Sequence, residues 1–222
     1  MASDPSLAFL DADVLASPVT RTLLIAGSDP AGLAVTWSQY AEDQANRHLP
    51  PRATSLTTIR ERILSRDLGP AGTWPERFAH TQVSDRRILA DAEAAGAVFL
   101  ITSDVDDFAE IDLIETSISA VNPDLFMAVR FPRTAYLHAL RQLVANMHNP
   151  PRSDAEMHAL IAKRHPRLFA RHADAYAVQP ARSAHHEPKT IFRGARCVRC
   201  GAVLPDPRSL DVGVEADCEL PV

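Results

Sequence analysis

Acidic side chains recur at four stations along the chain. The stations are Asp11, Glu42 with Asp43, Asp85, and Asp104 with Asp107. Asp11 and Asp104 each follow a short apolar run, so we expect them at the carboxyl edge of a sheet, where open α/β folds assemble their sites. Several carboxylates at one edge repel each other unless a hard cation neutralises them, and Mg²⁺ or Mn²⁺ takes such oxygen ligands. The pattern therefore predicts a metal-dependent enzyme.

Length and charge set the broad class of the protein. The chain has 222 residues, which suits one α/β domain with an appendage. Its formal net charge of -5 argues against a globally basic nucleic-acid coat. No apolar run approaches the roughly 20 residues that span a bilayer, and the first residues lack the basic and apolar regions of a signal peptide. We therefore expect a cytoplasmic protein with no membrane partner.

Apolar runs and capping residues predict the elements that position the carboxylates. Buried strands are expected at 8–10, 34–36, 97–102 and 118–121. Helices are expected at 18–26 with Gly27 as the stop, 39–49 after a Ser38 cap, 57–67, 85–95 between Ser84 and Gly96, 123–126, 134–147, and after the capping box Ser153-x-x-Glu156. Strands that alternate with helices imply right-handed crossovers. The predicted fold class is a three-layer α/β/α arrangement with a mainly parallel central sheet.

The composition of the sequence changes after Tyr176, where prolines and small polar residues indicate a linker. The cysteines all lie in the last thirty or so residues. We expect a main domain over 1–148, a helical extension with a linker over 149–190, and a small cysteine module over 191–222.

Four segments in this order resemble the motifs of the PIN domain family. They are 9–15, Trp37-Ser38 at the start of an acidic helix, 84–90, and 100–108, and the likeness extends to 121–126. The resemblance covers roughly residues 7–148 and implies a Mg²⁺- or Mn²⁺-dependent ribonuclease. Carried over by motif, Asp11, Asp85 and Asp104 would hold the metal ion, and Asp107 and Glu42 would assist. Many such domains are the toxin of a VapBC-type toxin-antitoxin pair.

The second motif departs from the family pattern. Counting from Ser38, the usual glutamate position falls on Gln44, while Glu42 and Asp43 come earlier. A helix turns about 100° per residue, so Glu42 faces well away from Gln44. A degenerate scaffold that binds RNA or protein without cutting is therefore an alternative.

The opening motif also resembles a second enzyme class. The segment 11–14 is similar to the nucleophile loop of haloacid-dehalogenase-type phosphatases. That class needs a lysine before its final acidic pair, and no lysine precedes Lys163. The phosphatase is the weaker alternative.

Other notable residues are expected to be structural. We expect Asp13, Asp106 and Asp112 to be loop or cap residues, Trp37 and Trp74 to lie in the core, and His165 and His172 to be surface or packing residues on a helix.

Arginines gather in the later part of the chain, at Arg130, Arg133, Arg141, Arg152, Arg164, Arg167 and Arg171. The planar guanidinium suits phosphate, so these side chains could hold an RNA backbone; a solvated helical face is the alternative. The expected partners are RNA, an antitoxin protein if the chain is a toxin, and a second copy of the chain in a homodimer.

The segment 197–201, Cys-Val-Arg-Cys-Gly, resembles a zinc knuckle of a small treble-clef-like module. Cys197, Cys200 and Cys218 are the expected zinc ligands. A fourth ligand is open between His185, His186, Asp217, Glu219 and water. An odd cysteine count argues against a structural disulfide, and a redox-active pair or a vestigial knuckle are the alternatives.

Overall fold

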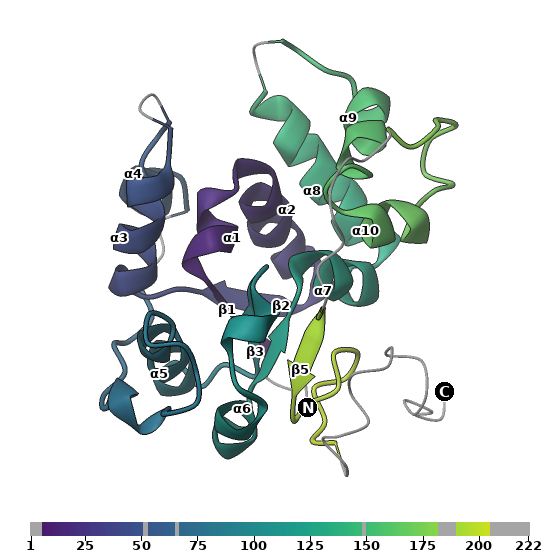
Figure 1. Cartoon of the computed structure of the whole chain (residues 1–222). Helices are drawn as coiled ribbons and strands as arrows, with labels where there is room; N and C mark the ends of the chain where they lie inside the picture. Colours follow the sequence, from purple (N-terminus) through teal and green to yellow (C-terminus); the bar gives the residue numbers. More distant parts are fainter. Residues whose placement is uncertain (1–5, 51–52, 65–66, 148–149, 182–189, 205–222) are drawn as a thin grey trace.

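The computed structural model describes residues 6–50, 53–64, 67–147, 150–181 and 190–204. Within these residues the strands form one sheet in the order β2-β1-β3-β4-β5 (Figure 1). The strands are β1 (Ser6–Leu10), β2 (Leu33–Thr36), β3 (Phe99–Ile101), β4 (Ser119–Val121) and β5 (Phe192–Gly194). The first four run parallel to their neighbours, and β5 pairs antiparallel with β4. The prediction of an α/β fold with a mainly parallel sheet is confirmed.

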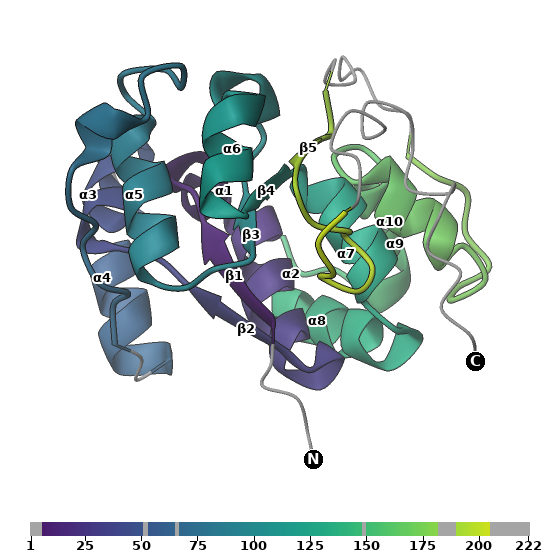
Figure 2. The ribbon, with the colours of Figure 1, turned by 90° about the horizontal axis from the view of Figure 1, so that it is seen from below.

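Helices lie on both sides of this sheet. The helices are α1 (Ala12–Ala16), α2 (Pro18–Ser28), α3 (Gln39–His48), α4 (Leu56–Thr58), α5 (Arg86–Ala94), α6 (Glu110–Thr116), α7 (Pro123–Arg130), α8 (Arg133–Ala145), α9 (Asp154–Ile161) and α10 (Pro166–Arg171). Three short 3₁₀-helices in the described residues are η1 (Asp29–Ala31), η3 (Pro75–Arg77) and η4 (Val105–Asp107). The element η2 (Ile59–Leu64) is π-helical. Figure 2 shows α3, α5 and α6 on one side and α2, α7 and α8 on the other. The arrangement is compatible with a three-layer α/β/α fold.

Several local signals in the sequence give the expected elements. The Ser38 side chain accepts a hydrogen bond from the amide of Ala41 at 3.2 Å and caps α3. Ser153 and Glu156 form the predicted capping box at the start of α9. Gly96 follows α5 with a φ of 71°, a left-handed conformation that glycine adopts without strain. These caps confirm the boundaries of α3 and α5 to within about two residues, and they confirm the start of α9.

Gly27 does not end its helix, because α2 continues to Ser28. A Cβ atom at residue 27 would lie 2.3 Å from the ring of Phe131, so the glycine allows α2 to approach that ring closely. The prediction that Trp74 belongs to the core is also wrong, since this residue is 75% exposed, while Trp37 is buried as expected. Ser84 does not cap α5 itself; Asp85 occupies the N-cap position, and Ser84 donates to its carboxylate at 2.7 Å.

Other differences concern element lengths and missed helices. The helix expected over 57–67 is a short α4 followed by π-helical η2, and 65–66 lie outside the described residues. Helices α1 and α6 and strand β5 are not predicted from the sequence. The helices α1 and α6 are only 5 and 7 residues long, so their hydrophobic period is too brief to detect.

The core lies along the central strands and the helices that cover them. The rings of Phe99 on β3 and Phe126 on α7 meet edge to face, with centroids 5.5 Å apart. Helices α9 and α10 pack on α8 and α7. The expected boundary at residue 191 falls at the start of β5, which joins the main sheet, so 190–194 is structurally continuous with it. In the described part of the chain no helix is long and apolar enough to cross a membrane.

Candidate active site

Two acidic residues of the predicted set leave neighbouring strands at the same edge of the sheet. Leu10 on β1 lies opposite Ile101 on β3, and Asp11 and Asp104 follow at the carboxyl ends. The Asp11 amide donates to the carbonyl of Ile101 at 3.1 Å and extends the pairing by one residue. Because β1 lies between β2 and β3, the chain connections diverge here, and ligands of open α/β sheets bind at such a switch point.

Asp11 is a buried N-cap of α1. Its Oδ1 atom accepts a hydrogen bond from the amide of Ala12 at 2.6 Å, and the residue is 7% exposed. Burial raises the pKa of Asp11 well above its usual range, and the negative charges of Asp13 and Asp85 raise it further. Hydrogen bonds from Thr102 and Ala12 lower this pKa, but they do not cancel the rise. A desolvated carboxylate among like charges is a group that a bound cation would stabilise.

Asp13 belongs to this region as well, and the prediction that it is a loop or cap residue is wrong, since it lies in α1. Its Oδ2 atom accepts a hydrogen bond from the amide of Ser103 at 2.9 Å, which ties α1 to the end of β3. Its Oδ1 atom is buried and has no hydrogen-bond partner among the described residues. Burial first, and then the charge of Asp104, raise the pKa of Asp13. The signal in the sequence is its place in the first turn after Asp11.

Asp85 and Asp107 complete the set of interacting carboxylates. Burial raises the pKa of Asp85, and the charge of Asp104 adds to this shift. Burial likewise raises the pKa of Asp107, followed by the charges of Asp85, Asp104 and Asp106. The Asp107 Oδ1 atom accepts a hydrogen bond from the side chain of Gln82 at 2.6 Å. We call Asp11, Asp13, Asp85, Asp104 and Asp107 the acidic group; each of its members is linked electrostatically to at least one other.

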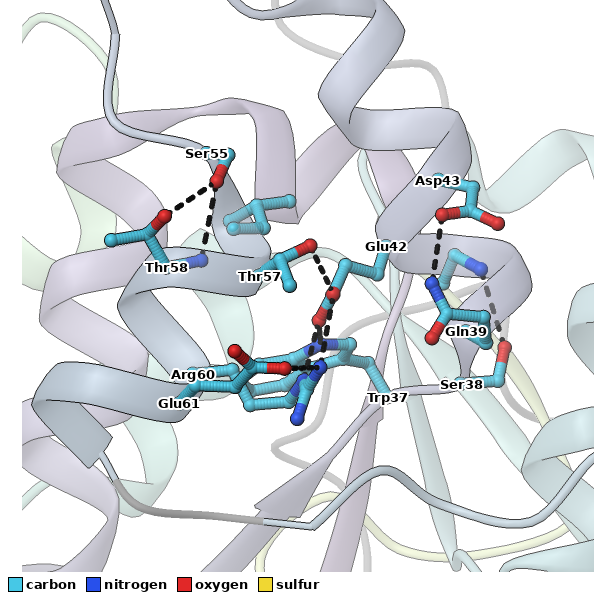
Figure 3. A network of polar contacts seen from close by, with 12 residues as sticks. Trp37, Ser38, Gln39, Glu42, Asp43, Ser55, Thr57, Thr58, Arg60 and Glu61 are labelled. Atoms are coloured by element: carbon cyan, nitrogen blue, oxygen red, sulfur yellow. Dashed lines mark hydrogen bonds and ion pairs between the residues drawn. The ribbon is translucent and has the colours of Figure 1, made fainter.

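Glu42 has a different set of partners (Figure 3). Its Oε2 atom accepts hydrogen bonds at 2.9 Å from Trp37 Nε1 and from Arg60 Nε, and its Oε1 atom accepts one at 2.7 Å from Thr57. Although burial acts to raise it, these hydrogen bonds bring the pKa of Glu42 below its ordinary value. Both carboxylate oxygens are thus occupied in holding α3 to α4 and η2. We therefore give Glu42 a structural role in place of the assisting catalytic role expected from the sequence.

Gln44 lies on another face of α3. The Tyr40 hydroxyl donates to the carbonyl of Ser84 at 3.5 Å, so this face of α3 approaches the residue before Asp85. Gln44 lies one turn further along the same face, and its Oε1 atom is buried with no hydrogen-bond partner in the described part of the chain. The position that carries glutamate in the PIN family pattern thus carries a neutral amide on the face of α3 that approaches Ser84.

Asp112, expected as a loop or cap residue, lies in the first turn of α6. Asp112 Oδ2 accepts hydrogen bonds from the amides of His80 at 3.2 Å and Thr81 at 2.7 Å. This residue holds the loop before α5 against α6.

Within the described residues, no set of three or more His, Cys, Asp or Glu side chains is arranged so that it could hold a metal ion as it stands. The acidic group contains the oxygen donors but not a closed ligand set. The predicted zinc ligands Cys197 and Cys200 lie in a tight turn, where the Gly201 amide donates to the Cys197 carbonyl at 2.8 Å. The third, Cys218, lies outside the described residues, as do the alternatives His185, His186, Asp217 and Glu219.

Most of the predicted RNA-binding arginines contact the protein itself. Arg133 pairs with Asp174 at 2.6 Å. Arg167 lies 3.7 Å from Asp124, and Arg130 donates to the carbonyl of Arg199 at 2.6 Å. These contacts hold α7, α8 and α10 to neighbouring segments, so they favour a structural role for these side chains.

Comparison with the models of known protein families, with curated proteins and with solved structures finds no match to this chain.

Proposed function

We propose that the protein is a Mg²⁺- or Mn²⁺-dependent endoribonuclease with a three-layer PIN-like domain. The observation that carries this proposal is the acidic group at the switch point of a parallel sheet, where burial first, and then the charges of neighbouring carboxylates, raise the pKa values of Asp11, Asp13, Asp85 and Asp107. Evolved proteins rarely gather desolvated like charges without a compensating partner. A divalent cation is the partner that fits.

The donor atoms agree with such an ion. Carboxylate oxygens suit Mg²⁺ and Mn²⁺, and the buried Oδ1 atom of Asp13 has no partner among the described residues. Asp11, Asp85 and Asp104 would hold the ion, assisted by Asp107 and Asp13. Asp104 is exposed, so its side chain can rotate to complete a ligand set. When bound, the ion would lower the pKa of a water molecule and neutralise charge on a phosphodiester.

The protein residues keep these carboxylates in place. The Ala12 amide fixes Asp11, the Ser103 amide fixes Asp13, and Gln82 fixes Asp107. The Thr102 hydroxyl accepts a hydrogen bond from the Asp104 amide at 3.1 Å and holds the turn after β3. In this mechanism water is the nucleophile, and no side chain needs to attack phosphorus.

Replacement of the ligands tests the proposal. Asp11→Asn and Asp85→Asn should each lower cleavage of labelled single-stranded RNA in Mn²⁺ by about 100-fold or more, because each removes a charged ligand. Asp29→Asn is the matched control, since Asp29 is exposed and precedes β2 at the opposite edge of the sheet. Unchanged cleavage by both site variants would rule out the assignment.

The second candidate is a scaffold that binds RNA or protein without cutting. The amide of Gln44 and the full engagement of Glu42 favour it, because together they leave α3 without a carboxylate for the acidic group. RNA binding by the parent protein without cleavage in Mn²⁺ would select this candidate.

Further elements of the proposal follow from the same resemblance. A toxin would be covered at the acidic group by an antitoxin. Cys197 and Cys200, with Cys218, would hold Zn²⁺ in the C-terminal module, and the protein would act in the cytoplasm. Metal analysis of Cys197→Ser tests the zinc assignment, because zinc content equal to that of the parent would exclude it.

A further inference from the structure

The segment 190–204 supplies β5, the strand at the β4 edge of the sheet, and also contacts the η4 turn that carries the last acidic residues (Figure 1). We call this segment the strap. Its strand β5 pairs with β4, and the Asn122 amide donates to the carbonyl of Ile191 at 2.8 Å. Arg196 in the strap donates to the carbonyl of Ser117 at 2.7 Å, and Phe192 is 6% exposed. The strap is therefore anchored on the sheet independently of the acidic group.

One side chain of the strap reaches the η4 turn. Arg193 Nη2 donates to the Asp106 carboxylate at 2.9 Å, and Arg193 Nη1 donates to the carbonyls of Phe108 at 2.9 Å and Asp106 at 3.3 Å. Thr190, also in the strap, donates to the same Asp106 oxygen at 2.6 Å. The planar guanidinium thus spans the turn and binds both its backbone and its side chain.

Arg193 shares the task of holding the η4 turn with other contacts, because the Gln82 amide donates to the carbonyl of Asp107 at 3.0 Å and Val105 and Phe108 are buried. The turn itself has 3 residues and is closed by the hydrogen bonds from the Asp107 amide to Asp104 at 3.0 Å and from the Phe108 amide to Val105 at 3.3 Å. Asp106 is directed at the strap, whereas Asp107 on the same turn interacts with Asp85 and Asp104. Arg193 therefore restrains the Asp106 side of the turn and the carbonyl of Phe108, while Gln82 holds the Asp107 side.

We propose that Arg193 is a positioning residue, which acts through Asp106 and the η4 carbonyls to help hold Asp104 and Asp107 against the rest of the acidic group. The inference rests on the proposed function for its consequence in catalysis, but the positioning itself can be measured without any activity. It gives the strap a role in the nuclease site that is separate from metal binding by its cysteines.

The first experiment measures the turn directly. Amide hydrogen exchange at 105–108 should be about tenfold faster in Arg193→Gln than in the parent protein, because the variant loses the hydrogen bonds that restrain the turn. Exchange at Asn122 reports whether β5 stays paired, and it should not change. The matched control is Arg199→Gln, which removes the same charge from an exposed position of the strap. Equal exchange at 105–108 in the two variants would overturn the inference.

The second experiment measures the consequence for the site. The binding of Mn²⁺ alone is measured by electron paramagnetic resonance. Arg193→Gln should bind Mn²⁺ about tenfold more weakly than the parent or Arg199→Gln, because residues that orient metal ligands without touching the metal typically have effects of this size. Arg193→Lys should recover part of this loss, because lysine keeps the positive charge but lacks the planar guanidinium that donates several hydrogen bonds at once. Faster exchange with unchanged Mn²⁺ affinity would contradict the link to the acidic group. A parent protein that binds no Mn²⁺ would contradict the proposed function, while the exchange measurement would still decide the role of Arg193.

Discussion

Arg60 Nε lies 2.9 Å from Glu42 Oε2, and this ion pair engages a carboxylate that the sequence assigns to catalysis. The Glu42 side chain is 0% exposed and that of Arg60 12% exposed. The pair joins α3 to η2, and Trp37 and Thr57 complete it. An acidic residue near a motif position can thus serve the fold instead of the reaction.

Glu42→Gln should lower the free energy of unfolding by about 2–3 kcal/mol, because it leaves Arg60 without its buried counter-charge. Mn²⁺ affinity should not change. Chemical denaturation of this variant and of Glu61→Gln makes the comparison, since Glu61 is the exposed partner of Arg60 and its loss should change stability by less than about 1 kcal/mol. Loss of Mn²⁺ binding with normal stability would return Glu42 to the site.

Asp13→Asn should stabilise the protein at neutral pH when no divalent cation is present. The pKa of Asp13 is raised in the folded protein, so the folded state holds its proton more tightly than the unfolded chain does. The free energy of unfolding therefore falls as the pH rises from the ordinary aspartate pKa through the raised pKa of Asp13. At pH 7 the carboxylate is ionised and destabilises the folded state. Asparagine removes the charge and keeps an acceptor for Ser103.

We expect a gain on the order of 1 kcal/mol, which raises Tm by about 2–4 °C in a protein of this size. Thermal unfolding at pH 7 and pH 3 measures it, and the gain should vanish at pH 3, where aspartate is protonated. A lower Tm than that of the parent at pH 7 would show that the charge of Asp13 is stabilising.

Gln44→Glu should increase the response of the protein to Mn²⁺. The substitution places a carboxylate on the face of α3 that approaches Ser84, so it adds repulsion without a cation and a donor with one. The rise in Tm on addition of Mn²⁺ should therefore be larger in Gln44→Glu than in the parent. Asp43→Glu, on an exposed face of the same helix, is the control. An identical Mn²⁺ response in Gln44→Glu and the parent would mean that residue 44 does not reach the acidic group.

The protein should lose stability as the pH falls below about 6.5, the ordinary histidine pKa. Burial lowers the pKa of His165 to about 3 and that of His172 to about 4, so between these values and 6.5 the unfolded chain binds more protons. His172 stacks on Tyr136 with ring centroids 4.4 Å apart, and His165 Nε2 lies 3.0 Å from the Thr20 hydroxyl.

From pH 7 to pH 5 each of these histidines should contribute a loss of about 2 kcal/mol. Denaturation of His172→Phe at both pH values should show a smaller loss than the parent, since phenylalanine keeps the stack and does not titrate. His48→Gln, at an exposed position, should keep the parent's pH dependence. Equal dependence in His172→Phe and the parent would exclude His172 as the cause.

The sequence was sufficient for the elements whose signals are local. The apolar run before Asp104 and the Ser38 cap predict β3 and α3 correctly, because a buried strand and a capped helix each depend on neighbouring residues. The same holds for the junction of β1 with Asp11, which places that carboxylate at the sheet edge.

The features that the sequence did not reveal depend on residues far apart in the chain. Gly27 continues a helix because Phe131 packs against it, and Asp13 belongs to the acidic group because the Ser103 amide holds it. The contact of Arg193 with Asp106 joins residues 87 positions apart. Neither spacing nor local propensity carries information on such contacts.

The anomalous scattering of a crystal soaked in Mn²⁺ tests the central claim most directly, because it locates the ion without an assay of activity. We predict a peak at the manganese absorption edge bounded by the carboxylates of Asp11, Asp85 and Asp104, and no such peak in crystals of Asp11→Asn. Crystals of the parent protein saturated with Mn²⁺ that show no peak among these three side chains would contradict the claim that they share a metal ion.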